Sequence, residues 1–304
     1  MTDYFVYTGC TTPVRLPAYE AATIAVLNHL DVNIKHMKDV NCCGAQYVES
    51  LSRNAFAAMS GRILAVAEQS GRDVIAVCGA CSGSLKHVKH MLDIEPDLKD
   101  EVNDTLAQEG LEYTGKVKVK HLLQILRDDV GYDVIRNAVV QPYNGVDLAA
   151  HYGCHVTRPA EIVQVDDPEV PRVIDDIIEA CGGDAIDYAG KVRCCGGPML
   201  AMDEIVASSI GSEKIANVKA AGARGIVTAC VFCNIQLTQV QFGEGGEPKD
   251  RIPVLTLPQF MGAAMGIDEE TLGMPLNKIS PHALLEFAHR IESKVIRREQ
   301  EAKR

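Results

Sequence analysis

The chain has 304 residues, enough for one large domain or two of ordinary size, and its apolar content of 47% can fill a substantial core. A formal net charge of −11 argues against a nucleic-acid partner, because nucleic acids select basic surfaces. No stretch has the roughly 20 apolar residues of a membrane span, and the polar start does not resemble a signal peptide. We therefore expect a soluble, cytoplasmic protein without membrane contact.

The first half of the chain alternates short apolar runs with longer helical patterns, which indicates α/β units around a mostly parallel sheet. The expected elements are strands over residues 4–7, 33–37 and 74–77 and helices over residues 18–30 and 55–69. Residues 93–112 form an acidic, helical stretch without a counterpart in the second half. This insertion is expected at the surface or at a partner contact.

The second half repeats this order of elements. Residues 141–145 form a turn-rich cluster, which places the boundary between a first domain of residues 1–143 and a second domain of residues 144–304. The second domain is expected to contain strands over residues 146–152 and 226–229 and helices over residues 170–180 and 199–221. The sequence thus predicts an α/β protein of two pseudo-symmetric halves, each with a mostly parallel sheet and flanking helices.

A last helix is expected from Pro281 onward. Its apolar residues recur at alternating spacings of four and three, at Leu284, Ala288, Ile291 and Val295. Such a stripe predicts a helix that docks on the body of the protein, although it could also contact a partner. Residues 297–304 are expected as a solvated tail.

Two copies of one cysteine pattern run through the chain. Each copy has a lone cysteine after a glycine, a Cys-Cys-Gly triplet and a Cys-x-x-Cys motif: Cys10, Cys42, Cys43, Cys78 and Cys81, then Cys154, Cys194, Cys195, Cys230 and Cys233. The interval between triplet and motif is 35 positions in both copies, and these parts of the copies are offset by 152 positions. Both Cys-x-x-Cys motifs follow expected strands, and ligand sites in open α/β sheets lie at such carboxyl ends. Each half is therefore expected to hold its own cysteine site.

Metal binding explains these cysteines better than disulfides, because cytoplasmic thiols are kept reduced. Zinc prefers four tetrahedral ligands, whereas each group offers five cysteines, two of them adjacent. Adjacent thiolates reach neighbouring irons of a cluster more readily than one zinc ion, so the pattern favours iron–sulfur sites, with zinc and disulfides as alternatives. Cys181 lies outside the repeat and is expected as a buried structural thiol.

The cysteine set closely resembles the CCG-domain family, and the resemblance covers essentially the whole chain. This family includes the B subunits of heterodisulfide reductases from methanogens and iron–sulfur subunits of glycolate, lactate, succinate and fumarate redox systems. No ferredoxin-type C-x2-C-x2-C-x3-C-P run accompanies the pattern, and this bare double form looks most like the heterodisulfide reductase B subunits. The resemblance implies two noncubane 4Fe-4S clusters, one on each group of five cysteines. Gly44 and Gly196 would let the backbone approach each cluster closely.

The resemblance also implies an oxidoreductase that reduces the mixed disulfide of coenzyme M and coenzyme B to two thiols, with one sulfur and one electron handled in each half. The implied partners are the ferredoxin-like 4Fe-4S protein that forms the C subunit of such a reductase and the flavin-containing, electron-bifurcating A subunit. A hydrogenase or formate dehydrogenase is implied as a further source. One alternative is an electron-transfer subunit of a quinone-linked dehydrogenase or a thiol-driven fumarate reductase. The other is a zinc-stabilised scaffold without enzymatic activity.

Both thiol products of that reaction are anionic, so basic side chains near the cysteines are candidate substrate contacts. The candidates are Arg15, Lys86, His87, His151, His155, Arg158 and Arg193. The helix after Cys81 also carries Lys89 and His90, whereas the equivalent stretch after Cys233 has no basic residue, so the more highly charged thiol is expected at the first half. The histidines could also donate protons to departing thiolates. For each candidate, exposure to water or a structural role is the alternative.

Overall fold

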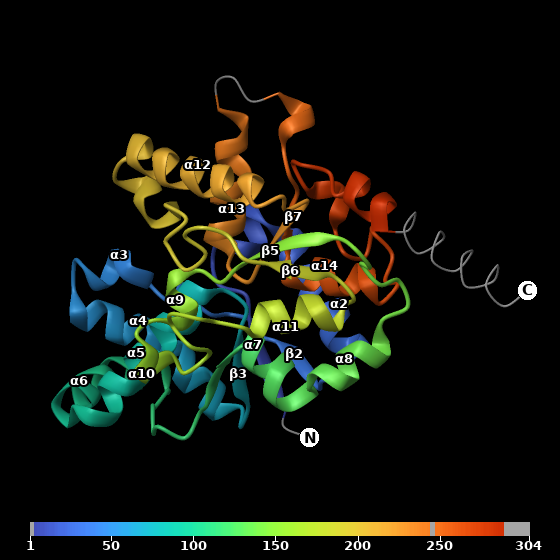
Figure 1. Ribbon diagram of the computed structural model, residues 1–304. Coiled ribbons are helices and arrows are strands. Elements are labelled where there is room, and N and C mark those ends of the chain that lie inside the picture. Colours follow the sequence, from blue (N-terminus) through green and yellow to red (C-terminus); the bar gives the residue numbers. More distant parts are fainter. Residues whose placement is uncertain (1–2, 244–246, 289–304) are drawn as a thin grey trace, which may run out of the picture.

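Two parallel sheets of four strands each form the centre of the molecule, one in each half of the chain (Figure 1). The computed structural model describes residues 3–243 and 247–288. The first sheet has the order β2-β1-β3-β4 and the second β6-β5-β7-β8, and all neighbouring strands are parallel. The strands are β1 (Tyr4–Tyr7), β2 (Ile34–His36), β3 (Asp73–Ala76), β4 (Val119–His121), β5 (Asp147–His151), β6 (Asp184–Ile186), β7 (Gly225–Thr228) and β8 (Val254–Thr256). This arrangement confirms the predicted fold class.

Both sheets have the same topological switch point. The chain leaves β1 for β2 on one side and then returns to β3 on the other side, and β5, β6 and β7 repeat this path. In open α/β sheets, ligand sites lie at the carboxyl ends of the strands beside such a switch point, which here are β1 and β3 in one half and β5 and β7 in the other. The sequence places a lone cysteine and a Cys-x-x-Cys motif at these two positions in each half.

The helices of the first half begin with α1 (Thr12–Arg15) and α2 (Pro17–His29), and α4 begins after the N-cap Ser52, whose hydroxyl accepts from Ala55 N. The acidic insertion is helical, as expected, and its buried residues Leu98, Val102 and Leu106 face α4 and α5. Figure 1 shows α6 at the outer edge of the molecule. The other elements of this half are α3 (Ala45–Glu49), α4 (Arg53–Gln69), α5 (Gly79–Ile94), α6 (Pro96–Leu106), η1 (Ala107–Glu109), α7 (Leu122–Gln124), the π-helical η2 (Ile125–Val130) and α8 (Tyr132–Ala138).

The second half repeats the plan, with a shorter connection before its last strand. The prediction of one helix over residues 199–221 is wrong, because the 3₁₀ helix η3 ends at Ala201 and Asp203 then caps α12 by accepting from Val206 N. The elements of this half are α9 (Cys154–Thr157), α10 (Ala160–Val163), α11 (Val173–Ala180), η3 (Gly197–Ala201), α12 (Glu204–Ala220), α13 (Val231–Gln239), η4 (Val240–Phe242), η5 (Pro248–Asp250), α14 (Leu257–Ala264) and η6 (Met274–Leu276). The other predicted strands and helices are present with ends shifted by a few residues, and the exact boundary between the domains stays a prediction.

Residues 282–288 are helical, and Leu284 and Ala288 are buried, so this part of the last helix docks as expected. Ile291, Val295 and residues 297–304 lie outside the described residues. Within the two described ranges, no helix combines the length and the apolar character needed to cross a lipid bilayer.

Helices from both halves pack against each other and join the two sheets into one body. In this interface α2 contacts α14, and α5 contacts both α9 and α10. The contact between α5 and α9 is close because a Cβ on Gly79 would lie 2.4 Å from Cγ2 of Val156. The interface therefore brings the start of α5, which follows Cys78, directly against the helix that begins with Cys154.

Candidate cysteine centre

Six of the ten repeated cysteines stand at or just after the carboxyl ends of the central strands, and the two Cys-Cys pairs lie in loops after the edge strands β2 and β6. Cys78 caps α5 just after β3, and Cys230 caps α13 just after β7. Cys10 follows β1, and Cys154 is the first residue of α9 after β5. The predicted position of the motifs at strand ends is confirmed.

Within each half, sulfur atoms of different motifs lie close together. In the first half the Sγ atoms of Cys10 and Cys42 are 3.1 Å apart, and those of Cys43 and Cys81 are 3.7 Å apart. In the second half Cys195 and Cys233 are separated by 3.4 Å. Cys10 is exposed, Cys42, Cys154 and Cys194 are half-buried, and the other six of these cysteines are buried. Each half thus has a cluster of thiols that reaches from the core toward the surface.

The two thiol clusters also meet each other. The Sγ atoms of Cys78 and Cys230 are 3.9 Å apart in the buried interface between the halves. These two cysteines occupy equivalent positions of the repeat, because they are separated by the offset of 152 positions. The repeat therefore builds one continuous centre instead of two separate sites.

The glycine before each lone cysteine leaves room for a sulfur atom of the same cluster. A Cβ on Gly9 would lie 2.8 Å from Sγ of Cys81, and a Cβ on Gly153 would lie 3.2 Å from Sγ of Cys233. Both glycines also have positive φ, of +75° and +78°, which other residues rarely adopt. The two halves use the same device to bring the backbone against the last cysteine of the motif.

The glycines of the two Cys-Cys-Gly triplets orient a backbone N–H toward sulfur. Gly44 N lies 3.4 Å from Sγ of Cys42, and Gly196 N lies 3.3 Å from Sγ of Cys194. Both glycines have positive φ, and a Cβ on Gly196 would lie 2.5 Å from the carbonyl oxygen of Ala207. These contacts are with Val48 of α3 at Gly44 and with the backbone of α12 at Gly196, so the expected approach of the backbone to a cluster stays a prediction.

Hydrogen bonds between thiols lower the pKa of one partner and raise that of the other. The contact with Cys154 lowers the pKa of Cys194 to about 2, and the same contact raises the pKa of Cys154. A hydrogen bond with Cys42 likewise holds the pKa of Cys43 well below its usual range. Thiols this close together cannot all ionise without a cation between them, and metals bind the thiolate form, so this donor set suits a metal or a metal cluster.

The chain belongs to the CCG cysteine-rich domain family. The family matches residues 4–86 and 148–238, which together make up more than half of the chain. Among relatives, it is similar to the B subunit of the ferredoxin/F(420)H(2)-dependent CoB-CoM heterodisulfide reductase of Methanosarcina acetivorans, with 31% identity over 284 residues that cover 92% of this chain and 94% of that protein. It is also similar to the "8-methylmenaquinol:fumarate reductase membrane anchor subunit" of Wolinella succinogenes, with 28% identity and coverage of 91% and 97%.

A solved structure shares the fold. A hypothetical protein from Helicobacter pylori matches with a TM-score of 0.76 and 14% identity, over 92% of this chain and 52% of that chain. The CCG chain therefore spans about half the length of that structure, and the likeness is one of fold alone.

This CCG protein has a small cavity at the cysteine centre and larger cavities elsewhere. A cavity of about 20 Å³ lies beside the second thiol cluster, and its lining includes Gly79 and Ala80 from the first half and His155, Cys195 and Phe232 from the second. The cysteines that line it all belong to the second half. Residues of both halves thus enclose the same space beside the sulfur atoms.

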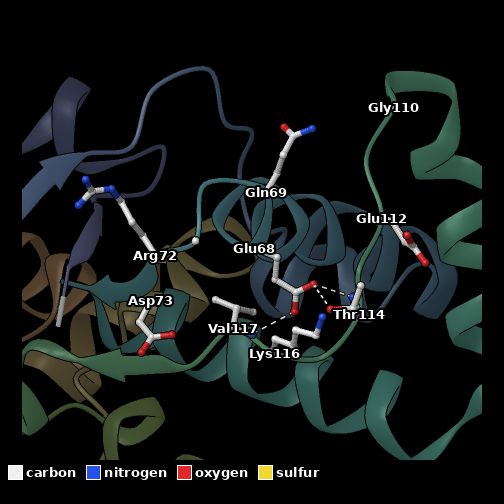
Figure 2. Close-up of a pocket in the computed structure, with 10 residues that line it drawn as sticks. Glu68, Gln69, Arg72, Asp73, Gly110, Glu112, Thr114, Lys116 and Val117 are labelled. Carbon is white, nitrogen blue, oxygen red and sulfur yellow. Dashed lines mark hydrogen bonds between the residues drawn. The ribbon is translucent and has the colours of Figure 1, made fainter.

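A cavity of about 450 Å³ lies at the opposite end of the first sheet, beside the amino-terminal end of β3 at Asp73. Figure 2 shows the carboxylate of Glu68 there, bonded to the loop before β4. Glu68 accepts from Thr114 N at 2.6 Å and from Val117 N at 3.0 Å, and these bonds lower the pKa of Glu68 against the effect of its burial. This acid is held in a structural role, and the cavity is not part of the cysteine centre.

The predicted substrate contacts do not gather in one place. His155 lines the small cavity beside the cysteines. His87 forms an ion pair with Glu49 at 3.3 Å, and Arg158 donates to the carbonyl oxygens of Val192 and Pro168. Arg15 and Arg193 are exposed, and Arg193 lies 3.3 Å from Glu213. The role of each as a substrate contact stays a prediction.

Lys86, Lys89 and His90 line a cavity of about 330 Å³ between α5 and α10. Lys86 is buried and donates to Gln124 Oε1 at 2.6 Å and to the carbonyl oxygen of Val163 in the other half. Burial lowers the pKa of Lys86 to about 7. Lys86 therefore links the two halves in this structure, in addition to its predicted role.

Lys214 is a residue of the centre that the sequence pattern did not identify. It is buried on α12, and its charge acts on the thiols of Cys233, Cys195 and Cys194. Burial lowers its pKa to about 8, so it remains mostly protonated at neutral pH. Its position relative to the Cys-Cys pair is repeated by Arg62 in the first half, and this offset is the signal that could have identified it.

Cys181 lies apart from the centre. It is fully buried, as expected for a structural thiol, and burial raises its pKa to about 12. A thiol with this pKa is a poor nucleophile and a poor ligand at neutral pH.

Proposed function

We propose that this chain is the catalytic B subunit of a heterodisulfide reductase, which reduces the mixed disulfide of coenzyme M and coenzyme B to the two thiols. Membership of the CCG family and the likeness to a heterodisulfide reductase B subunit over nearly the whole chain support this proposal. The observation that carries it is the distance of 3.9 Å between Cys78 and Cys230. Because the two thiol clusters meet, one small substrate at their junction is close to both.

The donor set fits an iron–sulfur cluster in each half. Five closely spaced thiols and backbone N–H groups directed at sulfur are features of such a site. We propose that Cys10, Cys42, Cys43, Cys78 and Cys81 hold one noncubane 4Fe-4S cluster and Cys154, Cys194, Cys195, Cys230 and Cys233 hold the other. When bound, these clusters would supply single electrons to the disulfide.

The reaction breaks one S–S bond and consumes two electrons and two protons, so that each sulfur leaves as a thiol. In our proposal each half handles one sulfur and one electron. His155 lines the small cavity beside the second thiol cluster and directly follows Cys154 in the chain. It is therefore the candidate that donates a proton to a departing thiolate. Gln46, Gly79 and Ala80 line the same space from the first half.

Electrons would come from partner proteins in the cytoplasm. We propose the ferredoxin-like 4Fe-4S protein that forms the C subunit of the reductase as the direct donor and the flavin-containing A subunit behind it, with a hydrogenase or formate dehydrogenase as the source. Cys10 supports an entry point in the first half, because it is the exposed cysteine among the ten.

A second candidate function is electron transfer in a fumarate reductase complex. The likeness to the protein from Wolinella succinogenes favours it, because that match covers 91% of this chain. In this case the same clusters would pass electrons onward without acting on a disulfide.

The test is an assay of the full-length protein, reconstituted with iron and sulfide without oxygen. With a reduced viologen as donor, we expect turnover of the heterodisulfide and none of fumarate or a menaquinone analogue. Loss of Cys194 in Cys194→Ser should abolish turnover, whereas Cys181→Ala should retain it, because Cys181 is remote from the centre. Zinc in place of iron, or full turnover by Cys194→Ser, would overturn the proposal.

A further inference from the structure

A buried tyrosine in the first half stands where the second half has a buried histidine. Tyr7 and His151 occupy equivalent positions, each three residues before the lone cysteine of its half and each at the end of a central strand. The hydroxyl of Tyr7 donates to the carbonyl oxygen of Asn41 at 3.0 Å. His151 is fully buried, and neither of its ring nitrogens has a hydrogen-bond partner among the described residues.

A buried imidazole without a partner is costly, because it has lost its hydrogen bonds to water and gained none in the protein. The position of His151 indicates what it faces. One of its ring nitrogens and the Sγ atoms of Cys195 and Cys233 all lie within 4.8 Å of one another. The unpartnered nitrogen therefore belongs to the space where the second cysteine group would hold its cluster.

A buried cation lies in the same half. Lys214 donates to the carbonyl oxygen of Gly190, and no carboxylate within the described ranges forms an ion pair with it. Its charge acts on Cys233, Cys195 and Cys194. The equivalent Arg62 of the first half pairs instead with Glu109 at 2.7 Å, so a carboxylate balances its charge.

We propose that His151 donates an N–H···S hydrogen bond to the cluster of the second cysteine group and, together with Lys214, gives it a higher reduction potential than the cluster of the first group. This inference rests on the proposed function, because it needs a cluster in each half. Reduction adds negative charge to a cluster, and hydrogen bonds to sulfur and nearby positive charge both stabilise that charge. An electron that enters at the first group is then favoured on the second.

The experiment compares the reduction potentials of the two clusters in full-length, reconstituted protein. A reductive titration followed by electron paramagnetic resonance gives one midpoint for each cluster. In His151→Leu we expect one midpoint to fall and the other to stay unchanged, with the same iron content as the wild type. His151→Gln keeps an N–H donor and should recover part of the shift. Lys214→Met should lower the same midpoint.

Tyr7→Phe is the matched control, because it changes the equivalent residue of the first half, whose hydroxyl is engaged with Asn41. Both midpoints should be unchanged in this variant. Unchanged midpoints in His151→Leu with full iron content would overturn the inference. A loss of about half the iron would also overturn it, because His151 would then be a ligand and not a donor.

If His151→Leu does not fold, the wild-type protein gives an independent answer. Pulsed electron paramagnetic resonance on protein labelled with ¹⁵N-histidine should show a weak nitrogen coupling to one reduced cluster and none to the other. Absence of that coupling from both clusters overturns the inference. Activity separates this outcome from failure of the proposed function. If the protein reduces the heterodisulfide but its two midpoints are equal and do not respond to the substitutions, only the inference is rejected. If the midpoints are distinct but the heterodisulfide is not reduced, only the proposed substrate is rejected.

Discussion

Individual glycines shape the thiol clusters as much as the cysteines do. Gly9 and Gly153 combine positive φ with a position where a side chain would meet a sulfur atom. Any other residue would thus meet two separate obstacles: a backbone conformation that it rarely adopts, and a sulfur atom in the space of its Cβ. The two effects can be separated by experiment, because other glycines of the chain have positive φ and open space around them.

We expect Gly153→Ala to lose the metal of the second cysteine group. Its Cβ would press on Sγ of Cys233, from 3.2 Å, and displace that ligand. Gly222 has a similar φ of +88° and no atom within 4 Å of an added Cβ, so Gly222→Ala carries only the conformational cost of about 1–2 kcal/mol. Metal content and urea unfolding check both variants. Equal metal content in the two would contradict this account of Gly153.

At this scale the sequence predicts the cysteines well and their surroundings poorly. Spacing alone assigned the ten cysteines to two groups and placed the motifs at strand ends. Lys214 was missed because the spacing of cysteines says nothing about other residue types; the offset that it shares with Arg62, 19 positions after each Cys-Cys pair, is the signal that points to it. The isolation of His151 could not be predicted either, because it depends on which polar groups the fold leaves out of reach.

Among the elements, α5 and α9 determine how closely the two halves approach. Gly79 begins α5 and packs on Val156 of α9 across the interface. Cys78 directly precedes Gly79, and Cys154 is the first residue of α9. A change in the helix contact is therefore transmitted directly to the cysteines.

Gly79→Ala should destabilise the protein and weaken metal binding, because its Cβ would lie 2.4 Å from Cγ2 of Val156. Overpacking of this kind typically costs about 1–3 kcal/mol. Val156→Ala alone should cost about 0.5–2.5 kcal/mol through the cavity it leaves. In the double variant the two changes compensate, so its loss of stability should be smaller than the sum. Urea unfolding of all four proteins measures this coupling, and strict additivity would exclude the contact.

The elements were predicted with uneven success for a physical reason. Buried strands and long amphipathic helices have periodic patterns, and most of them were found close to their observed bounds. The break between η3 and α12 was missed because helix-forming residues continue on both sides of Asp203, and only its side-chain hydrogen bond to Val206 N marks the new start.

For the whole molecule, the interface between the halves contains a buried lysine. Lys86 on α5 donates to Gln124 in its own half and to Val163 in the other. The pKa of Lys86 is about 7, mainly through burial and then through the nearby Arg127, with Asp128 acting in the opposite direction. Its charge is therefore unfavourable in the folded state.

The stability of the protein should depend on pH through Lys86. Its folded pKa of about 7 lies below the unfolded value near 10.4. Between these two values the unfolded chain binds more protons, so the contribution of Lys86 to the free energy of unfolding should rise with pH. The free energy of unfolding of the wild type minus that of Lys86→Met should then increase between pH 7 and 10. The same difference measured with Lys219→Met, at the surface, should stay nearly flat, and a flat difference for Lys86→Met would contradict its burial.

Lys86 also shows what the sequence could not reveal about the whole molecule. A basic helix after Cys81 suggested an open, charged pocket, but α10 of the other half covers part of it. Which half covers which helix depends on the packing of the two domains, and no local pattern in the sequence encodes that arrangement.

The contact between Cys78 and Cys230 bears on how such a chain could arise. Equivalent residues touch each other in this way at the axis of an isologous dimer, where each protomer meets its own copy. The double chain thus has the geometry of two identical protomers joined by gene fusion. In a true homodimer, any substitution appears on both sides of the axis at once. Fusion removes that constraint, so that one side can keep a tyrosine where the other acquires a histidine. An asymmetric substrate with two unlike sulfurs needs that freedom.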